Sequence, residues 1–174
     1  RDSETKPLLP PELRPLEKSS DPYLRHFTVV YRDDPSVAHD ADFWSELGQA
    51  TATNNDFGTS VMCLRKALKL DSNHLSARSN LAATLGGLGK HTEALDVISK
   101  VPDRSHRKEA ISANILQDME RHSEAIANYE LAIQDEPDFF LPYARILNSL
   151  RAIDSPLFEY WLEKGCQAVP ESAP

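Results

Sequence analysis

Glycine is scarce in this sequence, which holds six glycines among its 174 residues. All-β folds place a turn every eight to twelve residues or so and use glycine in many of those turns. The shortage therefore favours helices over strands. The sequence also contains neither a signal-peptide pattern nor an apolar run long enough to cross a bilayer, so we expect no direct binding to a membrane.

Basic residues are few as well. The chain has 19 Lys and Arg against 27 Asp and Glu, which gives a net charge of −8 at pH 7. Nucleic-acid binding takes most of its affinity from Lys and Arg that meet phosphates, so an acidic chain without a basic run is a poor candidate. The charge suits a neutral or basic protein segment as the partner.

Cysteine occurs only twice, as Cys63 and Cys166. Each lies inside an apolar helical pattern, which is typical of buried free thiols that pack as small hydrophobic groups. One pair does not make a disulfide framework, and the spacing does not decide whether the two are free. The compartment therefore stays unknown, with the cytoplasm as the default.

The sequence lacks the patterns of a catalytic, metal or cofactor site. The six histidines are scattered, and none stands four residues from a second metal ligand on a helix. Gly86-Gly87 is not followed by the Lys of a phosphate-binding loop. The acidic residues between Asp33 and Asp42 have no glycine at the place that a calcium loop requires. We therefore expect no enzyme, no metal and no cofactor.

Proline is concentrated at the beginning of the chain. Residues 1–20 contain Pro7, Pro10, Pro11 and Pro15 without any sustained helical periodicity. Proline fixes φ and removes a backbone donor, which suits extended chain better than helix. We therefore predict that residues 1–20 form a flexible proline-rich leader or linker. A ligand for a proline-binding domain, through the Pro7-x-x-Pro10 spacing, is the alternative.

A helix start follows at Asp21-Pro22, where Asp can accept bonds from first-turn amides and Pro fits the first helical position. Tyr23, Phe27 and Val30 then recur at helical spacing. The run at 27–31 would also suit a short strand, but we prefer the helix.

A repeat with a period of about 34 residues organises the rest of the chain. The units span residues 41–74, 75–105, 106–139 and a degenerate 140–170. Each unit contains two apolar stretches at helical spacing, joined by a short polar turn. The pattern His-Thr/Ser-Glu-Ala occurs in two of these turns, where we expect Thr92 and Ser123 to cap the second helix. One hairpin cannot bury its apolar face alone, so the units must stack.

Two sets of residues carry a resemblance to a known family. They are Trp44, Leu47 and Gly48, and then Ala125, Tyr129, Ala132 and Pro137. These sets resemble the tetratricopeptide repeat, whose pattern runs Trp-x2-Leu-Gly-x2-Tyr and then Ala-x3-Phe, Ala and Pro. Thr51 departs from the pattern at the tyrosine place. The resemblance implies an all-α fold: a right-handed α-solenoid of stacked antiparallel helix hairpins, with about three full repeats and atypical end units.

The resemblance also gives a meaning to the segments around the full repeats. Residues 41–174 become the repeat domain, and residues 21–40 an amino-terminal capping helix or half-repeat. Terminal units must be atypical because one of their sides faces solvent.

In this family the first helices of the repeats line a concave groove. The resemblance therefore implies a protein–protein interaction scaffold that holds an extended peptide or a partner helix. A carboxamide offers both donors and an acceptor, as a peptide backbone requires; the alternative is that these amides are only polar residues on a solvated face. The groove residues implied are Gln49, Asn80, Asn114, Asn148, Ser45, Ser79, Arg107, Gln117, Arg145 and Arg151.

Two other functions stay open at this point. The chain begins with Arg1 and not Met, which suits a non-catalytic region of a larger enzyme that positions a substrate or mediates dimerisation. Self-assembly into a homo-oligomer through an incompletely capped end is the second alternative. Family members that grip acidic chaperone tails use Lys and Asn in the first unit, and Ser45 and Gln49 stand at those two places here. Without the flanking cations a ligand carboxylate would be desolvated and unpaired, so we do not expect this chain to bind such tails.

Overall fold

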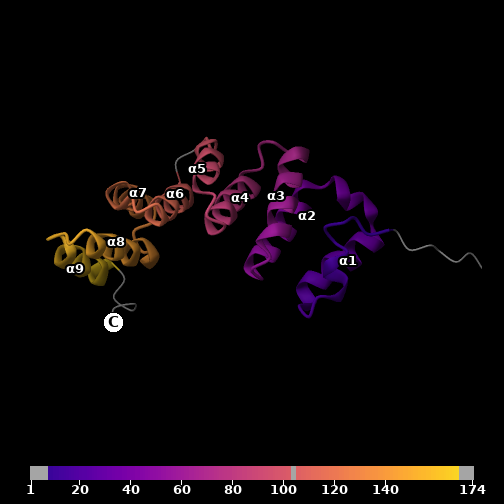
Figure 1. Cartoon of the computed structure of the whole chain (residues 1–174), viewed down its shortest axis with the longest axis horizontal. Helices are drawn as coiled ribbons and strands as arrows, with labels where there is room; N and C mark the ends of the chain where they lie inside the picture. Colours follow the sequence, from indigo (N-terminus) through magenta and orange to yellow (C-terminus); the bar gives the residue numbers. More distant parts are fainter. Residues whose placement is uncertain (1–7, 103–104, 169–174) are drawn as a thin grey trace, which may run out of the picture. The chain divides into compact units, whose positions relative to one another are not determined.

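The computed structural model describes residues 8–102 and 105–168, and in these ranges helices joined by turns are the regular secondary structure (Figure 1). Two short 3-10 helices, η1 and η2, accompany the α-helices. The elements are η1 (Pro15–Lys18), α1 (Pro22–Asp33), η2 (Pro35–His39), α2 (Ala41–Thr53), α3 (Phe57–Leu70), α4 (Leu75–Gly87), α5 (His91–Ser99), α6 (His106–Asp118), α7 (His122–Asp135), α8 (Phe140–Ala152) and α9 (Phe158–Ala168). The predicted all-α fold of helix hairpins is confirmed.

The chain forms two compact units, residues 1–84 (unit 1) and residues 85–174 (unit 2). In unit 1, α2 and α3 form a hairpin and α1 packs beside α2. In unit 2, the hairpin of α6 and α7 continues into α8 and α9, each packed on the helix before it. No helix in the described ranges combines the length and the apolar composition needed to span a membrane.

Side-chain caps explain where several helices begin. Asp21 accepts a hydrogen bond from the Tyr23 amide, with Pro22 in the first turn of α1. Asp40 caps α2 and Asp56 caps α3 in the same way. Since α1 continues to Asp33, the segment that also suited a strand is helical.

The predicted caps at Thr92 and Ser123 are wrong. The N-cap residues of α5 and α7 are Lys90 and Arg121, neither of which makes a side-chain cap bond. The helices start two residues earlier than we expected, at His91 and His122, so Thr92 and Ser123 already lie inside the first turn. Arg121 instead forms an ion pair with Glu124 across that turn, at 2.7 Å.

The α2–α3 hairpin depends on a close contact between Gly48 and Leu64. A Cβ at position 48 would lie 2.5 Å from the Leu64 Cγ, so no larger residue fits without movement of α3. Leu64 and Trp44 are completely buried in the same hairpin. The Trp44 indole N–H donates to the Ala38 carbonyl at 2.9 Å, so burial leaves its one polar group paired.

Unit 2 has its own core. Tyr129 from α7, Tyr143 from α8 and Trp161 from α9 belong to one cluster of buried side chains. Gly165 lets α9 approach α8, because a Cβ there would lie 3.3 Å from the Tyr143 Cβ. The consecutive helices therefore share one continuous apolar interior, as stacking of hairpins requires.

The amino-terminal segment differs from our expectation of a flexible leader. Leu9, Leu13 and Leu16 are buried, with 5%, 0% and 4% of their surfaces exposed. The prolines therefore set turns and the start of η1, while the leucines between them supply an apolar face. Residues 1–7 lie outside the described ranges.

An ion pair and a cation–π contact join this segment to the first hairpin. The Glu12 carboxylate lies 3.5 Å from the Lys66 ammonium, and that ammonium lies 3.7 Å from the centre of the Trp44 ring. Because Lys66 is held between an acid and an aromatic face, it connects the segment to both α2 and α3.

Both cysteines are free, with Cys63 buried and Cys166 half-buried. Burial, together with the nearby Glu12 carboxylate, raises the pKa of the Cys63 thiol to about 12. Cys63 therefore stays protonated near neutral pH and packs as an apolar side chain, because only a thiolate is a good nucleophile or metal ligand.

The Gly48 contact predicts that two glycine substitutions differ in their effect on stability. Gly48→Ala should lower the free energy of unfolding by about 1–3 kcal/mol, because the added methyl group overlaps a buried leucine. Gly58→Ala is the matched control, since its Cβ would meet nothing closer than 3.7 Å. Urea unfolding followed by circular dichroism measures both, and equal midpoints for the two variants would contradict the packing argument.

The folded amino-terminal segment predicts a cost for removing its central leucine. Leu13→Ala should destabilise unit 1 by about 2–5 kcal/mol, as expected for a leucine that is fully buried. Leu8→Ala, at a side chain that is 81% exposed, should change the stability by less than about 0.5 kcal/mol. Thermal unfolding of both variants distinguishes them. If the segment were a flexible leader, neither substitution would change the unfolding temperature.

Candidate functional site

The outward face of α2 carries a regular stripe of exposed side chains. Asp42, Glu46, Gln49 and Thr53 recur every three or four residues and are all exposed, so they share one face of the helix. Ser45, which we expected in the groove, has 4% of its surface exposed, and Ser79 in α4 has 6%. These two serines lie inside the protein, so they take no part in the candidate site.

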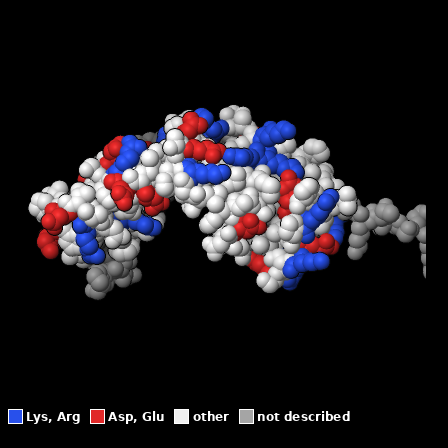
Figure 2. Space-filling model, in the orientation of Figure 1, with Lys and Arg blue, Asp and Glu red and all other residues white. Residues whose placement is uncertain are grey.

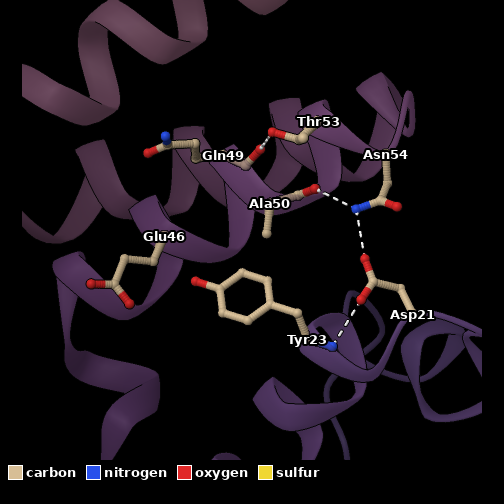
Figure 3. A pocket seen from close by; sticks show the side chains of 7 residues that line it. All are labelled: Asp21, Tyr23, Glu46, Gln49, Ala50, Thr53 and Asn54. Atoms are coloured by element: carbon tan, nitrogen blue, oxygen red, sulfur yellow. Dashed lines mark hydrogen bonds between the residues drawn. The ribbon is translucent and has the colours of Figure 1, made fainter.

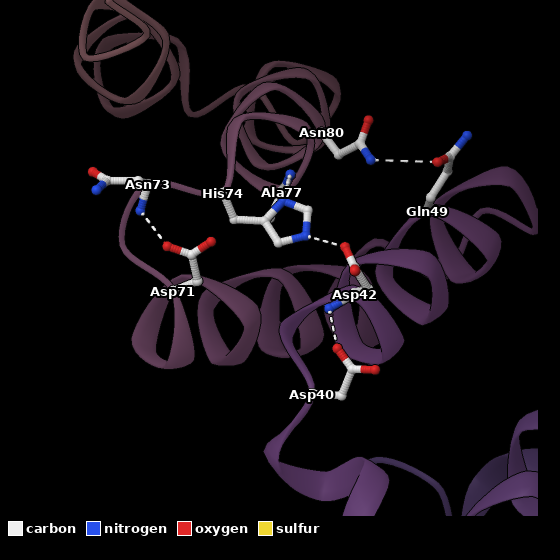
Figure 4. Close-up of polar contacts among 8 residues, drawn as sticks. All are labelled: Asp40, Asp42, Gln49, Asp71, Asn73, His74, Ala77 and Asn80. Carbon is white, nitrogen blue, oxygen red and sulfur yellow. Dashed lines mark hydrogen bonds and ion pairs between the residues drawn. The ribbon is translucent and has the colours of Figure 1, made fainter.

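Gln49 and Asn80 form an amide pair between the first helices of neighbouring hairpins. The Asn80 Nδ2 donates to the Gln49 Oε1 at 3.5 Å, a long bond, and Figure 4 shows the two side chains facing each other across the space between α4 and α2. Both were expected groove residues. The structure brings them together within unit 1.

His74 connects the starts of the same two helices. Its Nδ1 accepts from the Ala77 amide at 3.2 Å, and its Nε2 lies 2.9 Å from the Asp42 Oδ1 (Figure 4). Because Nδ1 acts as an acceptor, the proton of the neutral ring is on Nε2 and is donated to Asp42. His74 is therefore a cap of α4 that also holds α4 to α2.

A pocket of about 460 Å³ opens between the start of α1 and the outward face of α2 (Figure 3). Its lining is Asp21, Tyr23, Glu46, Gln49, Ala50, Thr53 and Asn54. Gln49 belongs to the groove set predicted from the sequence, and Thr53 lies on the same face of α2. Glu46 could have been predicted, because it lies three residues before Gln49 on the same face of the helix. Tyr23 and Asn54 could not, because they line the pocket only as a result of the packing of α1 beside α2.

Hydrogen bonds fix one end of this pocket. The Asp21 Oδ2 accepts from the Asn54 Nδ2 at 2.9 Å, and the same nitrogen donates to the Ala50 carbonyl at 3.1 Å. Asp21 also accepts from the Tyr23 amide at 2.8 Å through its other oxygen. These bonds tie the beginning of α1 to the end of α2, so the pocket wall is formed before any ligand arrives.

Two of the expected amides of unit 2, Asn114 and Gln117, bond to other residues of the same unit. The Gln117 Nε2 donates to the Arg145 carbonyl at 3.0 Å and to the Ser149 Oγ at 2.6 Å. The Tyr129 hydroxyl donates to the Asn114 Oδ1 at 2.6 Å. Burial raises the pKa of Tyr129, so its hydroxyl keeps the proton that it donates. Asn114 and Gln117 thus help to hold α6, α7 and α8 together.

The remaining predicted residues lie on unit 2 with different exposure. Asn148, Arg107 and Arg151 are exposed, and Arg145 is half-buried. The Arg151 guanidinium lies 5.4 Å from the Phe158 ring centre, and both line a second pocket of about 230 Å³ beside the turn between α8 and α9. In the described part of the chain, no group of three or more His, Cys, Asp and Glu could hold a metal ion.

Charge is mixed on the surface drawn in Figure 2. Within each unit, Lys and Arg side chains alternate with Asp and Glu, without one large patch of a single sign on this face.

These hairpins, with buried seams and polar outward faces on their first helices, define a helical-repeat protein. Residues 41–74, which form the α2–α3 hairpin, match the family profile described as Tetratricopeptide repeat. The resemblance expected from the sequence is thus confirmed, with the same boundaries for the first repeat. A fold of this class is that of a protein–protein interaction scaffold.

Solved structures share this fold at low sequence identity. A crystal structure of MamA is 18% identical with a TM-score of 0.70, covering 86% of this chain and 88% of that one. MamA from Desulfovibrio magneticus RS-1 is 18% identical with a TM-score of 0.68, covering 90% and 88%. The first TPR domain of human RPAP3 is 17% identical with a TM-score of 0.63, covering 67% and 94%. No curated protein sequence matches the chain.

The contrast between two amides of unit 2 can be tested by substitution. Gln117→Ala should lower the free energy of unfolding by about 1–3 kcal/mol, because it leaves partly buried acceptors without their donor. Asn148→Ala, at an exposed side chain, should stay within about 0.5 kcal/mol of the parent. Chemical denaturation of both variants measures the difference. An unchanged free energy of unfolding for Gln117→Ala would contradict the structural role and make Gln117 a binding candidate again.

Proposed function

We propose that this protein is a scaffold that binds an extended peptide segment of a partner on the outward face of α2 and α4, without catalysing a reaction itself. The observation that carries the proposal is the pocket of about 460 Å³ that includes Gln49, next to the amide pair of Gln49 and Asn80. A cavity of this size falls in the range of ordinary ligand sites, roughly 300–1,000 Å³.

The polar groups on this face suit a peptide backbone. An extended peptide presents amide donors and carbonyl acceptors in alternation, and a carboxamide can serve both. The Asn80–Gln49 bond is long at 3.5 Å, so it can be exchanged for bonds to a ligand at small cost. Gln49 is exposed, and in Figure 4 its amide nitrogen points away from Asn80.

The same face is held rigid by contacts that a ligand does not need to disturb. His74 joins α4 to Asp42 of α2, and Asn54 joins α2 to Asp21. A surface that is ordered in advance loses less conformational entropy when it binds, which favours affinity.

In unit 2 the proposal retains the exposed residues Asn148, Arg107 and Arg151 and the half-buried Arg145 as candidates for additional contacts. Arg151 lies beside the smaller pocket. Asn114 and Gln117 are engaged with Tyr129, so we give them a supporting role.

A peptide selection tests the proposal directly. Peptides chosen from a random phage-displayed library on the full chain would be synthesised, labelled and titrated by fluorescence polarisation. The double variant Gln49→Ala, Asn80→Ala should bind them about tenfold more weakly, since two lost hydrogen bonds cost about 1–2 kcal/mol together.

Gln167→Ala is the matched control, because it removes an exposed amide of α9 that, within the described residues, bonds only to Glu163 in its own helix. It should bind the peptides as the parent does. The proposal fails if the library yields no binder, or if the double variant binds as tightly as the control.

A further inference from the structure

The lining of the pocket in unit 1 is acidic. Its seven residues include the carboxylates of Asp21 and Glu46 and no Lys, Arg or His (Figure 3). We propose that this pocket receives a cationic side chain, Lys or Arg, of the bound peptide. The inference rests on the proposed function in taking a peptide as the ligand, and it adds the chemical class that the pocket selects.

The two carboxylates differ in what they can offer. Both Asp21 oxygens are used, one by the Tyr23 amide and one by the Asn54 side chain. Glu46 is exposed, and within the described ranges it makes no hydrogen bond or ion pair. A ligand cation can therefore pair with the Glu46 carboxylate without breaking an existing contact.

Tyr23 supplies an aromatic surface beside that carboxylate. Its side chain is 56% exposed, and Figure 3 shows the ring reaching from α1 toward α2 with its hydroxyl end toward Glu46. Lys and Arg are attracted to the face of such a ring, and their aliphatic parts pack on it. The Ala50 methyl group, which points toward the ring, completes an apolar wall for the stem of the side chain.

A row of edge-on rings holds Tyr23 in place. Its ring centre lies 5.4 Å from that of Phe27, Phe27 lies 5.6 Å from Phe43, and Phe43 lies 5.2 Å from Trp44. Phe27, Phe43 and Trp44 are buried, so the row anchors the exposed ring to the interior. The ring is therefore positioned before the ligand binds.

The helix ends at the pocket do not reverse this preference. The start of α1 carries a partial positive charge and the end of α2 a partial negative charge, so the two oppose each other. Asp21 already satisfies an amide at the start of α1. Glu46 therefore decides which charge the pocket prefers, and an acidic ligand side chain would face two carboxylates with no Lys, Arg or His among the lining residues.

Small amino-acid derivatives test the pocket without a selected peptide. The N-acetyl, N-methylamide derivatives of lysine, arginine, norleucine and glutamate would be titrated into the full chain and followed by ¹H–¹⁵N NMR. The lysine and arginine compounds should shift the amide signals of Tyr23, Glu46 and Gln49. Norleucine has the same stem without the charge, so it and glutamate should not.

Two variants at exposed positions then separate the contribution of the carboxylate from that of the aromatic ring. Glu46→Gln and Tyr23→Ala should each weaken binding of the lysine compound by about two- to fivefold, the range of a single exposed ion pair or cation–π contact. Glu130→Gln, at an exposed residue of α7, is the control and should bind as the parent does. The Glu46 effect should fall as salt is added.

The outcomes separate this inference from the proposed function. Equal binding of norleucine and lysine, no shifts with lysine, or an unchanged affinity of Glu46→Gln would overturn the cation pocket. If the selected peptides depend on Gln49 and Asn80 but contain no necessary Lys or Arg, the scaffold stands and the cation pocket falls. If lysine binds as expected but the library yields no peptide, the pocket stands and the scaffold proposal fails.

Discussion

The close approach of helices at small residues is the constraint on which the rest of the structure depends. Gly48 lets α2 lie directly on Leu64 of α3, and Gly165 does the same for α9 against Tyr143. When one stripe of a helix is pressed this closely on its neighbour, the opposite stripe is left in solvent. Glu46, two residues before Gly48, and Gln49, the residue after it, therefore lie on the outward side of α2 as a consequence of the contact at Gly48.

The packing of the amino-terminal segment likewise fixes the positions of helices at the beginning of unit 1. Leu13 and its neighbouring leucines are buried, and Lys66 joins Glu12 to Trp44. Helix α1 in turn packs beside α2 through the row of aromatic rings that begins at Trp44. The pocket exists because α1 is held there, so stability and the candidate site have a common origin in unit 1.

The amides show how similar residues acquire different roles. Gln49, Asn114 and Gln117 looked equivalent as polar residues on first helices. In the structure, Asn114 accepts a hydrogen bond from the Tyr129 hydroxyl, and Gln117 donates one from α6 to Ser149 of α8. Gln49, in contrast, stays exposed beside a pocket. The difference is made by the second helix of each hairpin: Tyr129 presents a hydroxyl to its first helix, and its counterpart Leu64 presents only carbon.

The helices, the first repeat at 41–74 and the cap at Asp21 could be predicted from the sequence, because they depend on local spacing and on bonds within a few residues. Sequence patterns could not predict that Ser45 is buried, that Leu13 is part of the fold, or that Tyr23 and Glu46 share a pocket. Those features depend on how each helix is rotated against its neighbour and on contacts between residues far apart in the chain. A one-residue change of phase turns a side chain by about 100° around the helix axis, and the local sequence pattern does not resolve it.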